Sequence, residues 1–118
     1  MPAHDPSEIH ALFLDAFNRG DLETVVSLYE PGAILIIDGE TLAGQEAIRR
    51  AYQRLVASRA HMELETRGLV ESQGLAVLHA SWTYHSQEMT TRGFSTEVVR
   101  QQADGTWRFL IDEPRMPQ

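Results

Sequence analysis

The hydrophobic residues of this chain change their period near residue 60, and this change is the strongest constraint on the fold. Before it, apolar residues recur every three or four positions in three segments, as in helices with one buried face. After it, they alternate over four long segments, as in half-buried strands. Helices followed by strands, without a regular alternation of the two, predict an α+β fold with segregated helices and an antiparallel sheet.

Capping residues set the expected limits of the helices. Asp5 is suited to begin the first helix, and Gly20 to end it. Asp21 is suited to cap a short second helix, whose apolar stripe includes Tyr29. The third helix is expected over residues 45–58.

Two Asp-Gly dipeptides divide the β-rich segments and predict hairpin turns. Asp38-Gly39 and Asp104-Gly105 are typical of two-residue turns. Counting outward from the second turn places Glu97 opposite Asp112, and it places Val99 opposite Leu110. The expected strands cover residues 33–37, 40–43, 61–71, 75–87, 93–102 and 106–113.

Composition limits the partners and the compartment that we expect. The 17 acidic and 10 basic residues leave a net charge of −7, so phosphate backbones and anionic lipids would repel the chain. We therefore expect neither nucleic acid nor membrane as a partner. Cysteine is absent, which excludes disulfides and thiolate metal sites and fits a cytoplasmic protein. We expect no signal peptide, and the 118 residues fit one domain, 1–118.

The order of several short motifs resembles the NTF2-like superfamily, the fold of ketosteroid isomerase and of SnoaL-like cyclases. These motifs are Phe17–Leu22, Leu28–Ala33, Gly44–Tyr52 and Asp104–Arg108. Residues 107–114 are most similar to a bacterial branch without an assigned activity that is often labelled ketosteroid isomerase-like. The resemblance covers nearly the whole chain, and it implies a cone-shaped fold in which three N-terminal helices pack on a curved, mostly antiparallel sheet.

The predicted pair of carboxylates is the main indication of chemistry. Two like charges that face each other on a sheet are destabilising in the open. In a pocket, their proximity and desolvation would raise the pKa of at least one, so that the pair shares a proton and suits general acid–base catalysis. The resemblance implies the same role, because Glu97 falls at the oxyanion-hole acid of ketosteroid isomerase and Asp112 at a pocket-facing position. We predict Glu97 and Asp112 as catalytic residues, assisted by His79.

Alternation over residues 75–87 leaves two assignments of the sheet faces open. His79 and Ser81 share one face, and Trp82 and Tyr84 share the other. Periodicity favours an aromatic face packed on the helices. The resemblance favours a polar face around a ligand pocket and an aromatic face buried in a homodimer, as is common in this superfamily. On the second assignment the pocket residues are Phe13, Phe17, Tyr29, Tyr52, Ser81, Val99, Gln101 and Leu110, and the dimer interface consists of Trp82, Tyr84, Trp107 and Phe109.

Departures from the isomerase limit the expected activity. Its catalytic tyrosine aligns with Phe13, which has no hydroxyl, and its general base aligns with Ile37. Asp38 is expected to form a turn, and His10 is expected to be exposed. The histidines lack metal-ligand spacing, so we expect no metal. We therefore predict no ketosteroid isomerase activity.

The sequence leaves two main classes of function open. One is a cofactor-independent enzyme that isomerises, dehydrates or cyclises a small apolar metabolite. The other is a non-catalytic ligand-binding or sensing module that uses the same carboxylates to hold its ligand. An interaction protein without a physiological small molecule is the third possibility.

Overall fold

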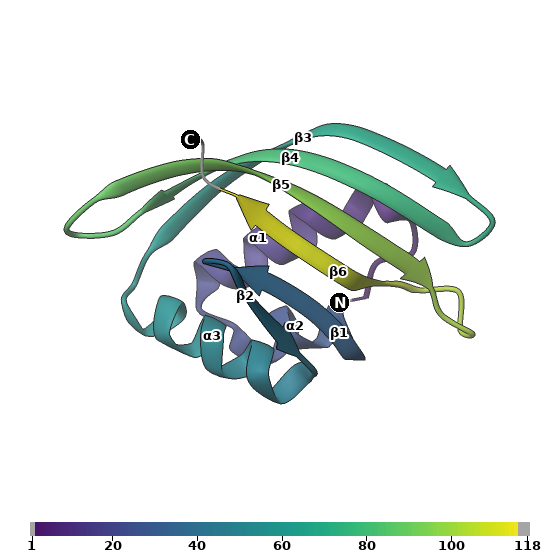
Figure 1. Cartoon of the computed structure of the whole chain (residues 1–118), viewed down its shortest axis with the longest axis horizontal. Helices are drawn as coiled ribbons and strands as arrows, with labels where there is room; N and C mark the ends of the chain where they lie inside the picture. Colours follow the sequence, from purple (N-terminus) through teal and green to yellow (C-terminus); the bar gives the residue numbers. More distant parts are fainter. Residues whose placement is uncertain (1, 116–118) are drawn as a thin grey trace.

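The structure, a computed structural model, describes residues 2–115, and within this range the chain forms three α-helices and six strands (Figure 1). A 3-10 helix, Pro6–Glu8, precedes the helices Ile9–Arg19 (α1), Leu22–Ser27 (α2) and Gln45–Ala57 (α3). The strands are Tyr29–Ile37 (β1), Glu40–Ala43 (β2), His61–Ser72 (β3), Leu75–His85 (β4), Thr90–Gln101 (β5) and Trp107–Arg115 (β6). None of the helices in the described range is long and apolar enough to cross a membrane.

The predicted caps lie at helix ends, although Asp5 caps the 3-10 helix that precedes α1 rather than α1 itself. The Asp5 side chain accepts a hydrogen bond from the Ser7 N–H at the start of the 3-10 helix. Gly20 ends α1 in the left-handed conformation, with φ at 74°, and the Asp21 side chain accepts from the Thr24 N–H at the start of α2. The second helix is shorter than predicted. Tyr29 begins β1 instead, because it pairs with Phe109 of β6.

The six strands form one mixed sheet in the order β2-β1-β6-β5-β4-β3. Only the pairing of β1 with β6 is parallel, and the other four pairings are antiparallel. The long strands β3, β4 and β5 arch over α1 in Figure 1, where α1 packs against β3 and α3 against β1. This arrangement leaves one face of the sheet turned toward the helices, which we call the inner face.

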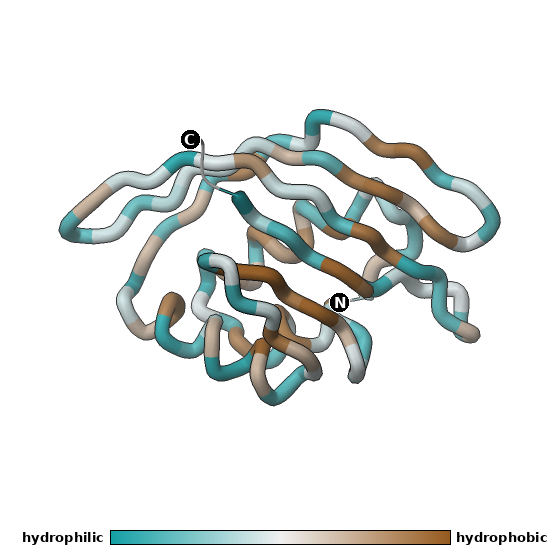
Figure 2. The backbone as a smooth tube through the Cα atoms, in the orientation of Figure 1, coloured by the Kyte–Doolittle hydropathy of each residue, from teal (hydrophilic) through white to brown (hydrophobic). Residues whose placement is uncertain are grey.

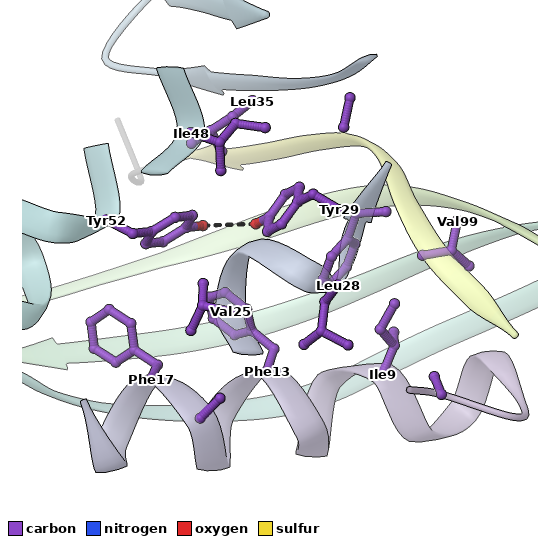
Figure 3. Close-up of a cluster of buried hydrophobic side chains, with 14 of the residues drawn as sticks. Ile9, Phe13, Phe17, Val25, Leu28, Tyr29, Leu35, Ile48, Tyr52 and Val99 are labelled. Carbon is purple, nitrogen blue, oxygen red and sulfur yellow. Dashed lines mark hydrogen bonds between the residues drawn. The ribbon is translucent and has the colours of Figure 1, made fainter. Parts of the chain in front are cut away.

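An aromatic cluster fills the space between the helices and the inner face. Phe13 of α1 contacts Tyr52 of α3 and Phe109 of β6, with ring centroids 5.6 and 6.1 Å apart. The Tyr29 ring lies tilted against Phe109, with the ring centroids 4.8 Å apart. Tyr29 is fully buried, and its side chain points toward Tyr52 (Figure 3). Hydrophobic stretches of β1 and β6 lie next to each other in the sheet (Figure 2). The core thus extends from α1 to these two strands.

The register of β5 and β6 corrects two details of the prediction. Residues 103–105 form a three-residue loop with Gly105 at φ 86°, because Gln102 pairs with Thr106 across its base. Val99 therefore faces Phe109 rather than Leu110. A bulge then inserts Leu110 into β6, and this extra residue restores the predicted register, so that Glu97 does face Asp112. The two-residue turn at Asp38-Gly39 forms as predicted.

A half-buried ion pair connects β1 with β5 across β6. The Arg100 guanidinium donates two hydrogen bonds to the Glu30 carboxylate, at 2.8 and 2.6 Å, and the Gln102 amide donates a third. The hydrogen bonds from Arg100 are the main cause that lowers the pKa of Glu30 below its ordinary value of 4.5. The pair therefore stabilises the fold above that pH, and this stabilisation is lost as the pH falls through the lowered pKa.

We predict that Glu30→Gln lowers the free energy of unfolding by about 1 kcal/mol at neutral pH. The difference from the wild type should disappear in acid, where Glu30 is protonated in both states. Chemical denaturation at several pH values measures this. Glu65→Gln, which removes the exposed partner of Arg67, is the control and should change stability by less than about 0.5 kcal/mol. An equal effect of both variants at every pH would contradict the prediction.

Candidate functional site

A cavity of about 590 Å³ lies between the helices and the inner face of the sheet. Its walls come from α1, α3, the β1–β2 turn and strands β3 to β6. Most of the lining is apolar, and a small group of polar side chains gathers on one wall. The polar group consists of His10, Tyr52, Glu97 and Asp112, and the apolar side chains include Phe13, Leu55, Met62, Leu64, Trp82, Tyr84 and Phe109.

Glu97 and Asp112 form the centre of the polar wall. They are direct cross-strand partners on β5 and β6, and only 3% of Glu97 and 6% of Asp112 are exposed. Side chains that face each other in this way have Cβ atoms about 5 Å apart. Two carboxyl groups so close in an apolar surrounding cannot both ionise without a large cost in free energy. Each of them is held by its own set of hydrogen bonds.

Two tyrosines hold Asp112. The Tyr29 hydroxyl donates to Asp112 Oδ2 at 2.5 Å, and it lies 2.9 Å from the Tyr52 hydroxyl (Figure 3). Burial raises the pKa of Asp112 to about 7, and the charge of Glu97 adds to this, while the tyrosine hydroxyls oppose it. Burial followed by the charge of Asp112 raises the pKa of both tyrosines, so both phenols keep their protons. Asp112 thus takes both the acid and the carboxylate form near neutral pH.

A histidine holds Glu97. His10 Nε2 lies 2.6 Å from Glu97 Oε1, and His10 Nδ1 lies 2.7 Å from the Thr66 hydroxyl on β3. Both side chains of the His10–Glu97 pair are 4% exposed, so the pair is shielded from water except through the cavity. With one ring nitrogen on Thr66 and the other on Glu97, the imidazole is fixed in its plane and can pass a proton to the carboxylate or take one from it.

His10 takes the place that the sequence analysis gave to His79. His79 faces Thr96 on the outer face of the sheet, with its Nδ1 3.3 Å from the threonine hydroxyl. The prediction of His79 as a helper of the pair is therefore wrong, because Glu97 faces Leu78, the neighbour of His79 on β4. His10 precedes Phe13 by three residues and Phe17 by seven, and this helical spacing was a signal that it is buried on the same face.

The predicted pocket residues separate into three groups. Phe13 and Tyr52 line the cavity. Phe17, Tyr29 and Val99 are buried in the core around it. The remaining three are corrections, because Ser81 lies on the outer face and receives a hydrogen bond from Arg67, Gln101 is exposed beside the last hairpin, and Leu110 occupies the bulge.

The four residues predicted for the dimer interface are also a correction, because they lie on the inner face of the sheet and not on its outer face. Trp82 and Tyr84 line the cavity, and Trp107 and Phe109 are 3% and 2% exposed in the core. The aromatic face of β4 thus packs toward the helices, as periodicity alone favours. Glu97 and Asp112 belong to this same inner face, because the register of the strands places Leu78, Glu97 and Asp112 in one cross-strand row.

Two further observations limit the chemistry of the cavity. Asp38 occupies its rim as part of the tight turn, with φ at 52°. Among residues 2–115, no three His, Asp or Glu side chains converge closely enough to bind a metal ion. The polar wall therefore offers two carboxyl groups, an imidazole and a phenol beside an apolar space. These groups can donate, accept and transfer protons.

The comparison with solved structures shows the fold of this chain in other proteins. An NTF2-like protein of unknown function from Shewanella oneidensis is 21% identical, with a TM-score of 0.81 over 92% of this chain and 93% of that one. A proposed dehydratase of the NTF2-like family from Streptomyces avermitilis is 18% identical, with a TM-score of 0.82 over 95% and 93%. A ketosteroid isomerase-like protein from Erwinia carotovora is 20% identical, with a TM-score of 0.74 over 94% of each chain.

No curated protein matches the sequence at a significant level. A family model does match it, and the match extends from residue 10 to residue 112. These limits coincide with the first and the last residue of the polar wall, His10 and Asp112. The chain belongs to the SnoaL-like domain family, and it has the fold of NTF2-like proteins.

Proposed function

We propose that this protein is a cofactor-independent enzyme that performs acid–base chemistry on a small, mostly apolar molecule bound in the cavity. The observation that carries this proposal is the Glu97–Asp112 pair, with a separate hydrogen-bond system on each carboxyl group. A purely structural wall of an apolar cavity would gain stability from apolar residues at these positions. The size of the cavity also lies within the usual range for small-molecule sites.

The two carboxyl groups are suited to opposite roles. Asp112 has a pKa of about 7, so at neutral pH a large fraction carries a proton that it can donate. Glu97 is joined to His10, through which a proton that it accepts can be shared. In a dehydration, Glu97 takes a proton from carbon while Asp112 protonates the leaving hydroxyl, and an alkene and water are formed. In an isomerisation, the same pair removes a proton at one carbon and returns one at another.

The relatives support this class of reaction but not a particular substrate. The Streptomyces avermitilis protein is described as a proposed dehydratase, and the Erwinia carotovora protein as ketosteroid isomerase-like. Both reactions are proton transfers on carbon skeletons. Phe13 has no hydroxyl at the position of the isomerase's catalytic tyrosine, so we do not propose ketosteroid isomerisation itself. Tyr52 is the cavity phenol here.

We expect the wild type to catalyse exchange of the α-protons of 2-tetralone, a neutral bicyclic ketone, in deuterated buffer near neutral pH. Asp112→Asn and Glu97→Gln should each reduce the enzymatic rate about 10²- to 10⁴-fold. Proton NMR measures the exchange, and Asp15→Asn on the exposed surface of α1 should keep the full rate. Binding of the ketone without exchange above the buffer rate would instead favour the non-catalytic ligand-binding module.

We also predict that Asp112→Asn stabilises the protein, by about 1–2 kcal/mol near pH 8 and by much less near pH 4. The pKa of Asp112 is raised from 3.8 to about 7, so its protonated form favours the folded state. That contribution is complete below 3.8 and is lost as the pH rises through about 7, where the folded protein must bury the charge. Thermal denaturation across this range measures the effect. Asp15→Asn should show no such trend, and an Asp112→Asn variant less stable than the wild type near pH 8 would contradict the prediction.

We propose further that two copies of the chain associate through the outer face of the sheet. Four apolar residues form one continuous cross-strand row there, Val70, Val77, Val98 and Ile111. Val70 is 71% exposed and Ile111 37%, and Phe94 is 58% exposed on the same face. An apolar row on an otherwise acidic protein is typical of an interface. This set replaces Trp82, Tyr84, Trp107 and Phe109 as the candidate contact.

Sedimentation velocity at micromolar concentration should show a homodimer for the wild type. Val77→Lys, in the middle of the row, should convert it to a monomer, because the lysine of each copy would have to lose its water in the interface. Thr83→Lys is the control, since it lies on the same face of β4 but six residues away from Val77. A wild type that sediments as a monomer would overturn the proposal.

A further inference from the structure

Two buried polar atoms of the cavity have no hydrogen-bond partner among the described residues. They are the Ser95 hydroxyl oxygen and the Trp82 indole nitrogen. Both residues line the cavity, and Ser95 is only 7% exposed. Buried polar atoms are paired in the great majority of cases, because an unpaired one loses its hydration without compensation. Neither atom takes part in the hydrogen bonds of the Glu97–Asp112 pair.

The strand register places both residues farther along the sheet than the carboxyl pair. Ser95 lies on the same face of β5 as Glu97, two residues and therefore about 7 Å along the strand. Trp82 faces Gly93, which is two residues farther in the same direction. The two donors thus follow one another along the inner face, away from the acid–base end of the cavity.

Gly93 gives the Trp82 ring its position. A Cβ atom on residue 93 would lie 2.3 Å from Trp82 Cζ2 and 2.8 Å from Cε2, the carbon that carries the indole nitrogen. The ring can therefore lie across β5 only because residue 93 has no side chain. This close approach brings the N–H edge of the ring over the strand that also carries Ser95.

We propose that Ser95 and Trp82 form a second subsite, which binds an oxygen acceptor at the far end of the ligand. The indole N–H can only donate, and the serine hydroxyl can donate as well, so the group they share must accept. The side chains around them, Leu64 and Tyr84 among them, are mainly apolar, and the nearby Arg115 is paired with Glu113 at 2.8 Å. A neutral acceptor such as an ether or a carbonyl oxygen therefore fits better than an anion.

The inference deepens the proposed function, because it rests on binding of a small molecule in the same cavity. It defines the substrate class as a neutral, elongated carbon skeleton with an oxygen group at each end. One oxygen group lies at Glu97 and Asp112, where the chemistry takes place. The other lies at Ser95 and Trp82, where it fixes the orientation of the ligand.

Two ketones that differ in one methoxy group test this subsite. Both 2-tetralone and 6-methoxy-2-tetralone carry the carbonyl at one end, and the second also carries an ether oxygen at the other. Isothermal titration calorimetry on the wild type should show about tenfold tighter binding of the methoxy compound. Ser95→Ala and Trp82→Phe should each bring the ratio of the two affinities close to one, and this ratio corrects for any change in the affinity for 2-tetralone itself. Ser81→Ala, on the outer face, should keep the preference.

Three results would overturn the subsite. The first is equal affinity of the wild type for the two ketones, which would mean that only water satisfies the two donors. The second is a preference for the methoxy compound that persists in both variants. The third is a clear fall in melting temperature for Ser95→Ala without ligand, because an unpaired hydroxyl should be removable without loss. None of these results concerns proton exchange of 2-tetralone, so the proposed function would stand or fall separately.

Discussion

The pairing of β5 with β6 is the constraint on which the arrangement of the interior depends. It brings Val99, Glu97, Phe109 and Asp112 to the same face of the sheet, although the last two are three residues apart in β6. An odd separation normally sends two strand residues to opposite faces, and only the bulge at Leu110 reverses this. Without the extra residue, a strand that buries Phe109 in the core would expose Asp112 on the outside. The core and the polar wall are thus compatible because of one inserted residue.

Once both carboxyl groups are inside, the surrounding side chains determine how the protein tolerates them. Asp112 is held by a phenol that keeps its proton, and Glu97 is held by an imidazole that can lose or gain one. These are different solutions to the same desolvation problem, and they give the two carboxyl groups different hydrogen-bond partners. An asymmetric pair of this kind is what a reaction that both removes and donates a proton requires. The hydrogen bonds that allow the fold to bury two carboxyl groups are therefore the same ones that suit the pair for the proposed chemistry.

The two faces of the sheet carry different side chains and contact different surroundings. The inner face of β4 presents Leu78, Trp82 and Tyr84 toward the helices and the cavity, whereas the outer face carries His79, Ser81 and the apolar row through Val77. The aromatic residues are thus used for the interior. The surface proposed for self-association consists of smaller aliphatic residues. They form one continuous row across four strands.

The sequence by itself determined the elements of this protein, because caps, turn residues and hydrophobic period act over a few residues. Asp21 and Gly20 mark helix ends, Asp38-Gly39 forms the expected turn, and counting along the chain already predicted that Glu97 faces Asp112. Only the tertiary structure decided which face of the sheet is buried, since alternation defines two faces without saying which one meets the helices. For the same reason His10 and Ser95 were missed as parts of the interior. Their neighbours, Glu97 and Ala80, come from distant segments that meet only in the folded sheet.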